Sequence, residues 1–217
     1  MRKWITIAVL TVGLLPVSVP GPGLAQEVTD RIVARVETEI ILLSDIRQLA
    51  RYQVFLDGKA QSDADILNRL IDQWIVRNEA TVARFPKPSD DDVNRSIERL
   101  KRSFASPEEF QTRQKNSGIT DEEIRQFVGA QLYLSNYLDS RFRPAIQIDE
   151  KAIEEFYKSR VVPRAESRGQ APPTLDTARD FIQEALVQQA INEQADRWLK
   201  ESRARVRVEI MMGEKPK

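Results

Sequence analysis

The last patterned stretch of the chain, "RARVRVEIM" over 203–211, alternates charged and apolar residues, whereas most of the chain has the spacing of helices. This alternation is typical of a β-strand that buries one face. A single strand is not stable in water, because its backbone donors and acceptors need partners and its apolar face needs cover. The rest of its sheet must therefore come from elsewhere in the sequence.

The other β-prone region lies near the opposite end of the chain. "DRIVARV" and "EIILL", within 30–43, are separated by two residues, which is the spacing of a tight hairpin. We expect the C-terminal strand to join this hairpin in a three-stranded antiparallel sheet, with Val206, Val208 and Ile210 on the core face. Both ends of the folded chain then belong to one core, which excludes a simple division into an N-terminal and a C-terminal domain.

The segments between the strands have helical periodicity and helix-capping residues. Helices are predicted over 44–56, 62–83, 89–104, 106–118 and 120–143, in a segment that ends near 160, and over 175–202. The predicted fold class is therefore mainly α, a helical core with a small three-stranded sheet. Residues 88–120 are predicted to form a projecting helical lobe, and the proline-rich, polar stretch 161–174, which lacks periodicity, a linker.

The N-terminus has the pattern of a secretory signal peptide. A basic start precedes an apolar run over 4–15, and small residues lead up to Ala25. A membrane anchor is the alternative interpretation, but the run is shorter than the roughly 20 residues that span a bilayer, and two prolines interrupt its continuation. We expect the peptide 1–25 to be removed by cleavage after Ala25. The exported domain, 26–217, is then expected to be soluble, with no stable insertion in the membrane.

The composition limits the chemistry that the chain can perform. There is no cysteine and no histidine, so thiol catalysis, the Ser-His-Asp triad and nearly all zinc sites are excluded. A formal charge of +0 gives no indication of nucleic-acid binding. The acidic run 90–92 could be a metal site, but no further ligand lies at a matching spacing, and acids are favoured in the first turn of a helix. No catalytic residue, metal site or cofactor is predicted, although an exported enzyme with two carboxylates, such as a glycosidase, remains an alternative.

Five segments together resemble a known family. They are "DRIVARVETEIILLSDI", "ILNRLIDQWIV", "SGITDEEIRQFVGAQL", "IQIDEKAIEEFYKSR" and "ADRWLKESRARVRVEI". In this order they are similar to the hairpin, the long helices and the closing helix and strand of the SurA-like periplasmic chaperones, and the resemblance covers nearly all of the expected mature chain. One departure is large, because the family's parvulin domain would sit where 161–174 lies, and 14 residues cannot form a domain of roughly 100.

The resemblance implies a location and a function. In this family the helical core holds unfolded outer-membrane proteins in the periplasm, and the parvulin domains isomerise X-Pro bonds. The chain is therefore expected to be an ATP-independent holdase chaperone for unfolded outer-membrane proteins or other exported polypeptides, without isomerase activity. A structural adaptor that binds one folded partner and an isomerase-related enzyme are kept as alternatives.

Five aromatic residues are not explained by the predicted core faces and are candidates for client binding. They are Phe55, Phe104, Phe110, Tyr133 and Tyr137. Aromatic rings on a second helix face can bind extended, aromatic-rich segments whose alternate side chains enter shallow apolar pockets. The same rings can instead pack against another helix of the bundle, and the sequence leaves both interpretations open.

Overall fold

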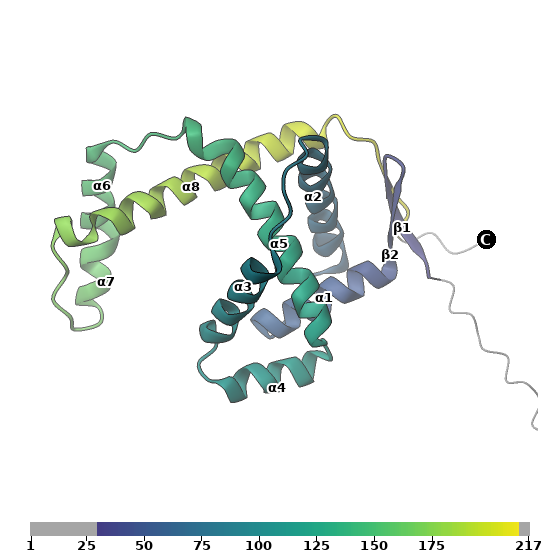
Figure 1. The fold of residues 1–217 in the computed structure, drawn as a ribbon, viewed down its shortest axis with the longest axis horizontal. Helices are drawn as coiled ribbons and strands as arrows, with labels where there is room; N and C mark the ends of the chain where they lie inside the picture. Colours follow the sequence, from purple (N-terminus) through teal and green to yellow (C-terminus); the bar gives the residue numbers. More distant parts are fainter. Residues whose placement is uncertain (1–29, 213–217) are drawn as a thin grey trace, which may run out of the picture.

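The structure is a computed structural model that describes residues 30–212, so the expected signal peptide at 1–25 lies outside the described residues (Figure 1). The strands are β1 (Ile32–Val36), β2 (Glu39–Leu42) and β3 (Val208–Ile210). The α-helices are α1 (Leu43–Asp57), α2 (Asp63–Val82), α3 (Asp90–Ser103), α4 (Pro107–Ser117), α5 (Asp121–Phe142), α6 (Glu150–Phe156), α7 (Val162–Glu166) and α8 (Leu175–Arg203). The remaining helical turns are the 3-10 turn η1 (Arg143–Ala145) and the π-helical turn η2 (Tyr157–Val161). The fold is mainly α with a small sheet, as predicted.

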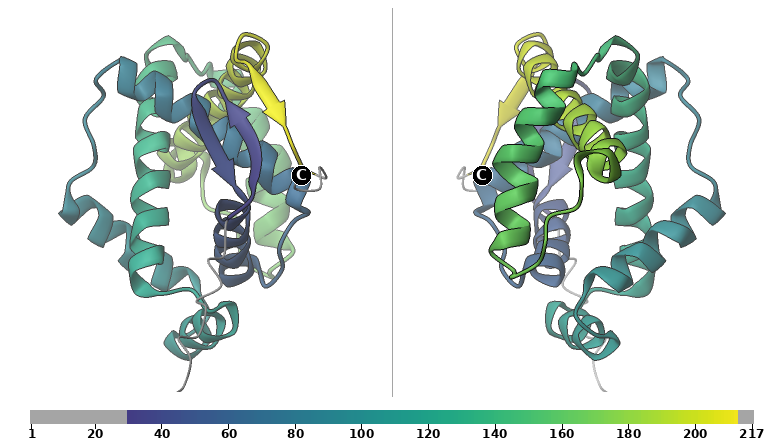
Figure 2. Two further views of the ribbon diagram at one scale, coloured as in Figure 1. Left: turned by 90° about the vertical axis from the view of Figure 1, so that its right-hand side faces the viewer. Right: turned by 90° about the vertical axis from the view of Figure 1, so that its left-hand side faces the viewer.

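The two ends of the described chain meet in one antiparallel sheet with the strand order β2-β1-β3, which confirms the prediction (Figure 2). Glu37, in the two-residue turn between β1 and β2, has a positive φ of 52°, which non-glycine residues rarely adopt. Its N–H donates to the Arg207 carbonyl at 3.0 Å. At the other end of the ladder, the Met211 N–H donates to the Val33 carbonyl at 2.9 Å. The C-terminal strand therefore completes the sheet that the N-terminal hairpin begins.

β1 contains a bulge that the sequence did not predict. Its pairing with β2 shifts between Ile32 and Ala34, so Val33 is an extra residue in β1. In a regular strand the adjacent side chains of Val33 and Ala34 would point to opposite faces of the sheet. Both are fully buried, because the bulge turns them toward the same core.

The prediction for the core face of the C-terminal strand is only partly correct. Val206 and Val208 are half-buried and pack against the main core. Ile210 lies opposite Ala34 in the register, yet it is 56% exposed. The reason is that β3 is a three-residue edge strand, and the helices cover the sheet beneath β1 and β2 instead of the outer end of β3.

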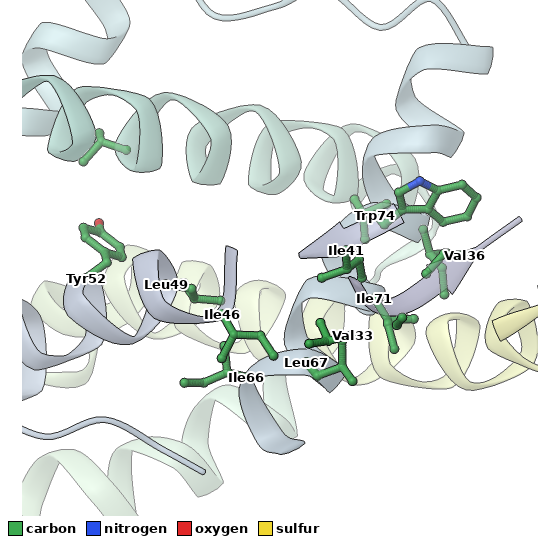
Figure 3. Close-up of a cluster of buried hydrophobic side chains, with 14 of the residues drawn as sticks. Val33, Val36, Ile41, Ile46, Leu49, Tyr52, Ile66, Leu67, Ile71 and Trp74 are labelled. Atoms are coloured by element: carbon green, nitrogen blue, oxygen red, sulfur yellow. The ribbon is translucent and has the colours of Figure 1, made fainter. Parts of the chain in front are cut away.

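The main core lies between the sheet and the first two helices (Figure 3). The buried side chains drawn there come from the hairpin, from α1 and from the apolar stripe predicted for 62–83: Val33, Val36, Ile41, Ile46, Leu49, Tyr52, Ile66, Leu67, Ile71 and Trp74. Burial of one large aliphatic side chain contributes roughly 1.5–3 kcal/mol. The packing of α1 and α2 on the sheet therefore supplies much of the apolar stabilisation of the fold.

Most helices begin at the capping residues that the sequence predicts. Hydroxyl side chains accept the backbone N–H three residues further on at the starts of α2, α3, α4 and α5, from Ser62, Ser89, Ser106 and Thr120. Thr174, which lies within the predicted linker, caps α8 in the same way. The first helix differs from the prediction, because it begins at Leu43 and places Ser44 inside the helix. The Asp45 carboxylate accepts the Leu42 N–H at 2.8 Å and so closes the strand-to-helix junction.

Two parts of the fold have separate apolar clusters. We call the sheet, α1–α5 and the C-terminal half of α8 the body, and α6, η2, α7 and the N-terminal half of α8 the arm. Figure 1 shows the arm on the opposite side of α5 from the sheet. In the arm, a small cluster around the buried residues Ile153, Ala178 and Ile182 holds α6 against α8.

The arm corrects two predicted boundaries. The helix expected to end near 160 continues to Glu166, so the N-terminal part of the predicted linker 161–174 is helical. A proline such as Pro163 has no N–H and its ring clashes with a regular α-helical turn. The π-helical turn η2 just before it widens the helix and lets the chain continue. The Tyr157 hydroxyl then donates to the Pro173 carbonyl at 2.7 Å, which ties the following loop back to this helix.

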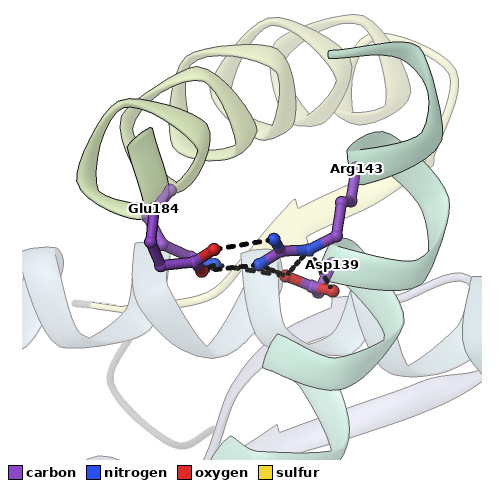
Figure 4. Close-up of polar contacts among 4 residues, drawn as sticks. Asp139, Arg143 and Glu184 are labelled. Carbon is purple, nitrogen blue, oxygen red and sulfur yellow. Dashed lines mark hydrogen bonds and ion pairs between the residues drawn. The ribbon is translucent and has the colours of Figure 1, made fainter. Parts of the chain in front are cut away.

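A polar network joins the arm to the end of α5 (Figure 4). Arg143 lies between Asp139 of α5 and Glu184 of α8, and Nη2 donates to a carboxylate oxygen of each at 2.8 Å. The Gln188 amide donates to both carboxylates as well. Hydrogen bonds from Arg143 lower the pKa of Glu184 to about 2 and also lower the pKa of Asp139. The network is solvent-exposed, so its contribution is screened by salt.

Candidate functional site

The five candidate aromatic residues fall into two clusters on the body. We call Phe55 of α1, Phe104 after α3 and Phe110 of α4 the phenylalanine cluster. Its ring centres are 5.2 to 5.3 Å apart, and Phe110 is edge-on to the other two. Phe55 is fully buried and Phe110 is 8% exposed, whereas Phe104 is half-buried. The cluster holds α4 against α1, and Phe104 is the ring that reaches the surface.

Polar contacts from Arg113 fix the position of α4. Its Nη1 donates to the Leu56 carbonyl at 2.9 Å, which satisfies one of the carbonyls left open at the end of α1. Nη2 pairs with Glu109 at 2.8 Å. The guanidinium carbon lies 5.8 Å from the centre of the Phe104 ring, in cation–π range. These contacts place the Arg113 guanidinium against the Phe104 ring from the side of α4.

A cavity of about 580 Å³ lies outside the phenylalanine cluster, between the end of α3, α4 and the start of α5. We call it the α3–α4 cavity. Phe104 and Phe110 form part of its apolar wall. Its rim is charged: Lys101 pairs with Glu98 at 2.9 Å, and Arg102 has no carboxylate partner among the described residues. Its size is within the range of ligand-binding cavities in proteins.

The second group, which we call the tyrosine cluster, contains Tyr133 and Tyr137 of α5 together with Phe85. The Phe85 ring centre is 6.0 Å from that of Tyr133 and 5.6 Å from that of Tyr137. Tyr137 is 5% exposed, and its hydroxyl accepts from Arg141 at 3.1 Å. Tyr133 is half-buried, and its hydroxyl donates to the Phe85 carbonyl at 3.4 Å. The connection between α2 and α3 therefore covers this face of α5.

A cavity of about 280 Å³ lies beside Tyr133, between α5 and the start of α3. We call it the α5 cavity. Gly129 and Ala130 leave space on the α5 surface here, and Val93 of α3 lies opposite. A Cβ atom at Gly129 would meet the Val93 side chain at 3.6 Å, which is an ordinary van der Waals contact. An alanine therefore fits at this position, whereas a larger side chain would fill the cavity.

The two interpretations of the candidate residues both apply, to different rings. Phe55, Phe110 and Tyr137 are buried because they pack against neighbouring helices, so they mainly support the two clusters, although Phe110 also contributes to the wall of the α3–α4 cavity. Phe104 and Tyr133 are half-buried and border cavities. Phe85 was missed by the sequence analysis, since the prolines beside it indicated only a break between helices.

Two carboxyl groups with shifted pKa values have structural partners. The Ser89 hydroxyl and backbone lower the pKa of Asp92, because this residue of the acidic run 90–92 forms a capping box. Burial raises the pKa of Asp72, but its carboxylate accepts from Arg203 at 3.0 Å and so links α2 to α8. Burial also raises the pKa of Tyr52 to about 12. In the part of the chain that the structure describes, no group of three or more acidic side chains could hold a metal ion.

Comparisons with known proteins agree with the resemblance seen in the sequence. No family model matches the chain. Within residues 30–212, no helix is both long and apolar enough to cross a bilayer. The chaperone SurA of Pseudomonas syringae pv. tomato (strain ATCC BAA-871 / DC3000) is 25% identical to the chain over 138 residues, which are 60% of this chain and 32% of that protein. The chain thus spans about a third of the length of this relative, and the similarity between the two is distant.

Proposed function

We propose that this protein is an ATP-independent periplasmic holdase chaperone that binds unfolded outer-membrane proteins. The observation that carries the proposal is that a half-exposed aromatic ring borders a cavity at two places on the body. Phe104 borders the α3–α4 cavity and Tyr133 borders the α5 cavity. The similarity to a protein named chaperone SurA supports the same class of function.

Binding in this proposal uses alternate side chains of an extended client segment. An aromatic client side chain that enters either cavity meets Phe104 or Tyr133, and one such ring pair contributes about 0.5–1.5 kcal/mol. Each contact is weak, because ordering of the client offsets much of the gain. A client that reaches both cavities binds more tightly, because the second contact is intramolecular. Weak contacts of this kind permit release without ATP.

The location and the missing isomerase activity belong to the same proposal. The periplasm follows from the signal peptide expected at 1–25 and from the resemblance to periplasmic chaperones. Of the predicted linker 161–174, the part beyond α7 is a short loop after Glu166. A loop of this length has no room for a parvulin domain, so the proposed activity is binding without catalysis of bond rotation.

The test is dilution of an unfolded outer-membrane β-barrel protein from urea, with and without this protein, followed by light scattering. We expect scattering to be suppressed at several-fold molar excess. No suppression would contradict the holdase proposal. A prolyl-peptide isomerisation assay is run in parallel, and a catalysed rate there would show that the activity is not binding alone.

Position 129 offers a matched pair of variants for the same assay. Gly129→Leu fills the α5 cavity, whereas Gly129→Ala adds only a methyl group that fits against Val93. We expect weaker suppression of scattering by Gly129→Leu and unchanged suppression by Gly129→Ala, with circular dichroism confirming that both fold. Equal activity of the two variants would exclude the α5 cavity as a client site.

A further inference from the structure

The outer edge of β2 has backbone groups that the sheet does not use. At the two ends of the β1–β3 pairing, the Glu37 N–H donates to Arg207 and the Val33 carbonyl accepts from Met211. By alternation, Arg35 between them also faces β3. By alternation, the residues of β1 that bond to β2 are Ala34 and Val36. Their partners in β2 lie on either side of Ile40, so the Ile40 N–H and carbonyl point away from β1. No other described residue hydrogen-bonds to these two groups.

A cavity of about 230 Å³ opens at this edge. Ile40 and Ile41 both border it, although adjacent side chains of a strand point to opposite faces of the sheet. The cavity therefore lies at the edge of the sheet and not on one face. Leu70 and Trp74 of α2 and Phe127 of α5 supply apolar walls. Ile40 itself is 49% exposed, so apolar surface and free backbone groups occur side by side.

The rim limits the open edge to a short stretch centred on Ile40. On one side, Glu39 pairs with Arg77 of α2 at 3.2 Å. On the other side, the Asp45 carboxylate already accepts the Leu42 N–H. The edge therefore offers a ligand the backbone N–H and carbonyl of one residue, Ile40. Charged side chains lie on both sides of these groups.

We propose that the β2 edge binds an extended segment of an unfolded polypeptide as a fourth strand, with one apolar side chain of that segment in the adjacent cavity. The chemistry of the edge selects the occupant, because a free strand N–H and carbonyl are matched by the backbone of another strand. The proposal rests on the proposed function. It adds backbone hydrogen bonds between the β2 edge and the client to the side-chain contacts described above. Backbone pairing accepts many client sequences, while the cavity requires only an apolar side chain at one position.

The opposite edge of the sheet is a matched control. Arg207 and Met211 bond to β1, and by the same alternation Val208 and Ile210 direct their N–H groups outward from β3. Ile210 is 56% exposed, so it resembles Ile40 in exposure and backbone direction. It borders neither the cavity at the β2 edge nor the α3–α4 and α5 cavities.

The first test compares proline substitutions at the two edges. Proline is tolerated on an edge strand where its missing N–H faces outward, so neither Ile40→Pro nor Ile210→Pro removes a bond of the sheet. The probe is a fluorescein-labelled ten-residue peptide in which valine and tyrosine alternate with serine and threonine, and its binding is followed by fluorescence anisotropy. We expect Ile40→Pro to weaken binding roughly tenfold. We expect Ile210→Pro to leave it within about twofold. Equal affinities of the two variants would overturn the proposal.

The second test leaves the protein unchanged and therefore decides the question if Ile40→Pro does not fold. Two versions of the peptide carry N-methyl groups, one on the odd residues and one on the even residues. In a docked strand only one of these sets points toward β2. One version should lose binding and the other should retain it. Retention by both versions, or absence of binding by the unmodified peptide, would contradict docking at a strand edge.

The edge proposal and the holdase proposal can fail separately in these experiments. If the wild-type protein suppresses scattering of the unfolded β-barrel protein but both methylated peptides bind, the edge proposal is wrong and the holdase proposal stands. If the wild-type protein does not suppress scattering, the holdase proposal itself is wrong.

Discussion

The body and the arm are stabilised by different interactions. The body has a large apolar core together with the phenylalanine and tyrosine clusters. The arm has a small cluster around Ile153, Ala178 and Ile182, and exposed polar contacts such as those of Arg143 with Glu184. Exposed ion pairs typically contribute less than about 1 kcal/mol. The arm therefore depends on few side chains and should open more easily than the body.

One long helix, α8, contributes buried side chains to both the body and the arm. The C-terminal half of α8 has Trp198 in the main core, whereas its N-terminal half has Ile182 in the arm cluster. We expect local opening of the arm to expose α6 without disturbing the sheet, since segments with few buried contacts open at lower free energy.

Phe55→Ala should cause the largest loss of stability, about 3–5 kcal/mol, because a fully buried ring of the body is removed. Phe181→Ala is the matched change in the arm, where the ring is 70% exposed and the loss should stay within about 0.5 kcal/mol. Urea unfolding followed by circular dichroism measures both. Similar losses for the two variants would show that the phenylalanine cluster is not part of the stabilising core.

Ile182→Ala should cost about 2–4 kcal/mol, because Ile182 is fully buried in the arm cluster. The loss should be local. Amide hydrogen exchange is expected to become faster in α6 and the start of α8, while the buried amides of α1 and α2 keep their protection. Equally faster exchange in α1 and α2 would mean that the arm and the body unfold as one unit.

Deletion of residues 204–217 should destabilise the body by about 2–3 kcal/mol. The deletion removes the half-buried side chains of Val206 and Val208 and the backbone bonds of β3 to β1. We expect a lower thermal midpoint by circular dichroism and a tendency to aggregate, because the edge of β1 becomes free. An unchanged midpoint would show that the fold does not need the third strand.

Acid should weaken the arm slightly. The pKa of Glu184 is lowered to about 2 in the folded protein, below its ordinary value of 4.5, through hydrogen bonds from Arg143. A lowered carboxyl pKa gives stability that is present above about pH 4.5 and is lost as the pH falls toward 2. Wild type should therefore melt at a higher temperature than Glu184→Gln at pH 7, with the gap closing near pH 2. Equal midpoints at pH 7 would show that the Glu184 carboxylate contributes nothing to stability.

Local sequence patterns predicted the elements that depend on local physics. The alternation in "RARVRVEIM" and the hairpin spacing within 30–43 predicted the sheet, because each strand needed a partner. Side chains such as Ser62 and Thr120 predicted helix starts, because caps act within one turn. The starts of helices and the pairing of the strands were therefore accessible from the sequence.

Features that depend on contacts between distant elements were not predicted. The bulge at Val33 places two adjacent side chains in one core, and the π-helical turn before Pro163 replaces the expected helix end. Spacing on α5 placed Tyr137 on a second face, but it could not show that Phe85 covers that face. For the same reason the sequence could name five candidate rings but could not separate Phe104 and Tyr133 from the buried ones.

Photo-crosslinking can show whether the half-exposed rings contact unfolded clients. A benzoylphenylalanine residue replaces Phe104 or Tyr133, and in a control it replaces Val82, which is 76% exposed on α2. Each protein is illuminated with an outer-membrane β-barrel protein, once unfolded and once folded. We expect crosslinks from positions 104 and 133 to the unfolded protein, few from position 82, and none from any position to the folded protein. Crosslinks that are as strong from position 82, or as strong to the folded protein, would contradict this expectation.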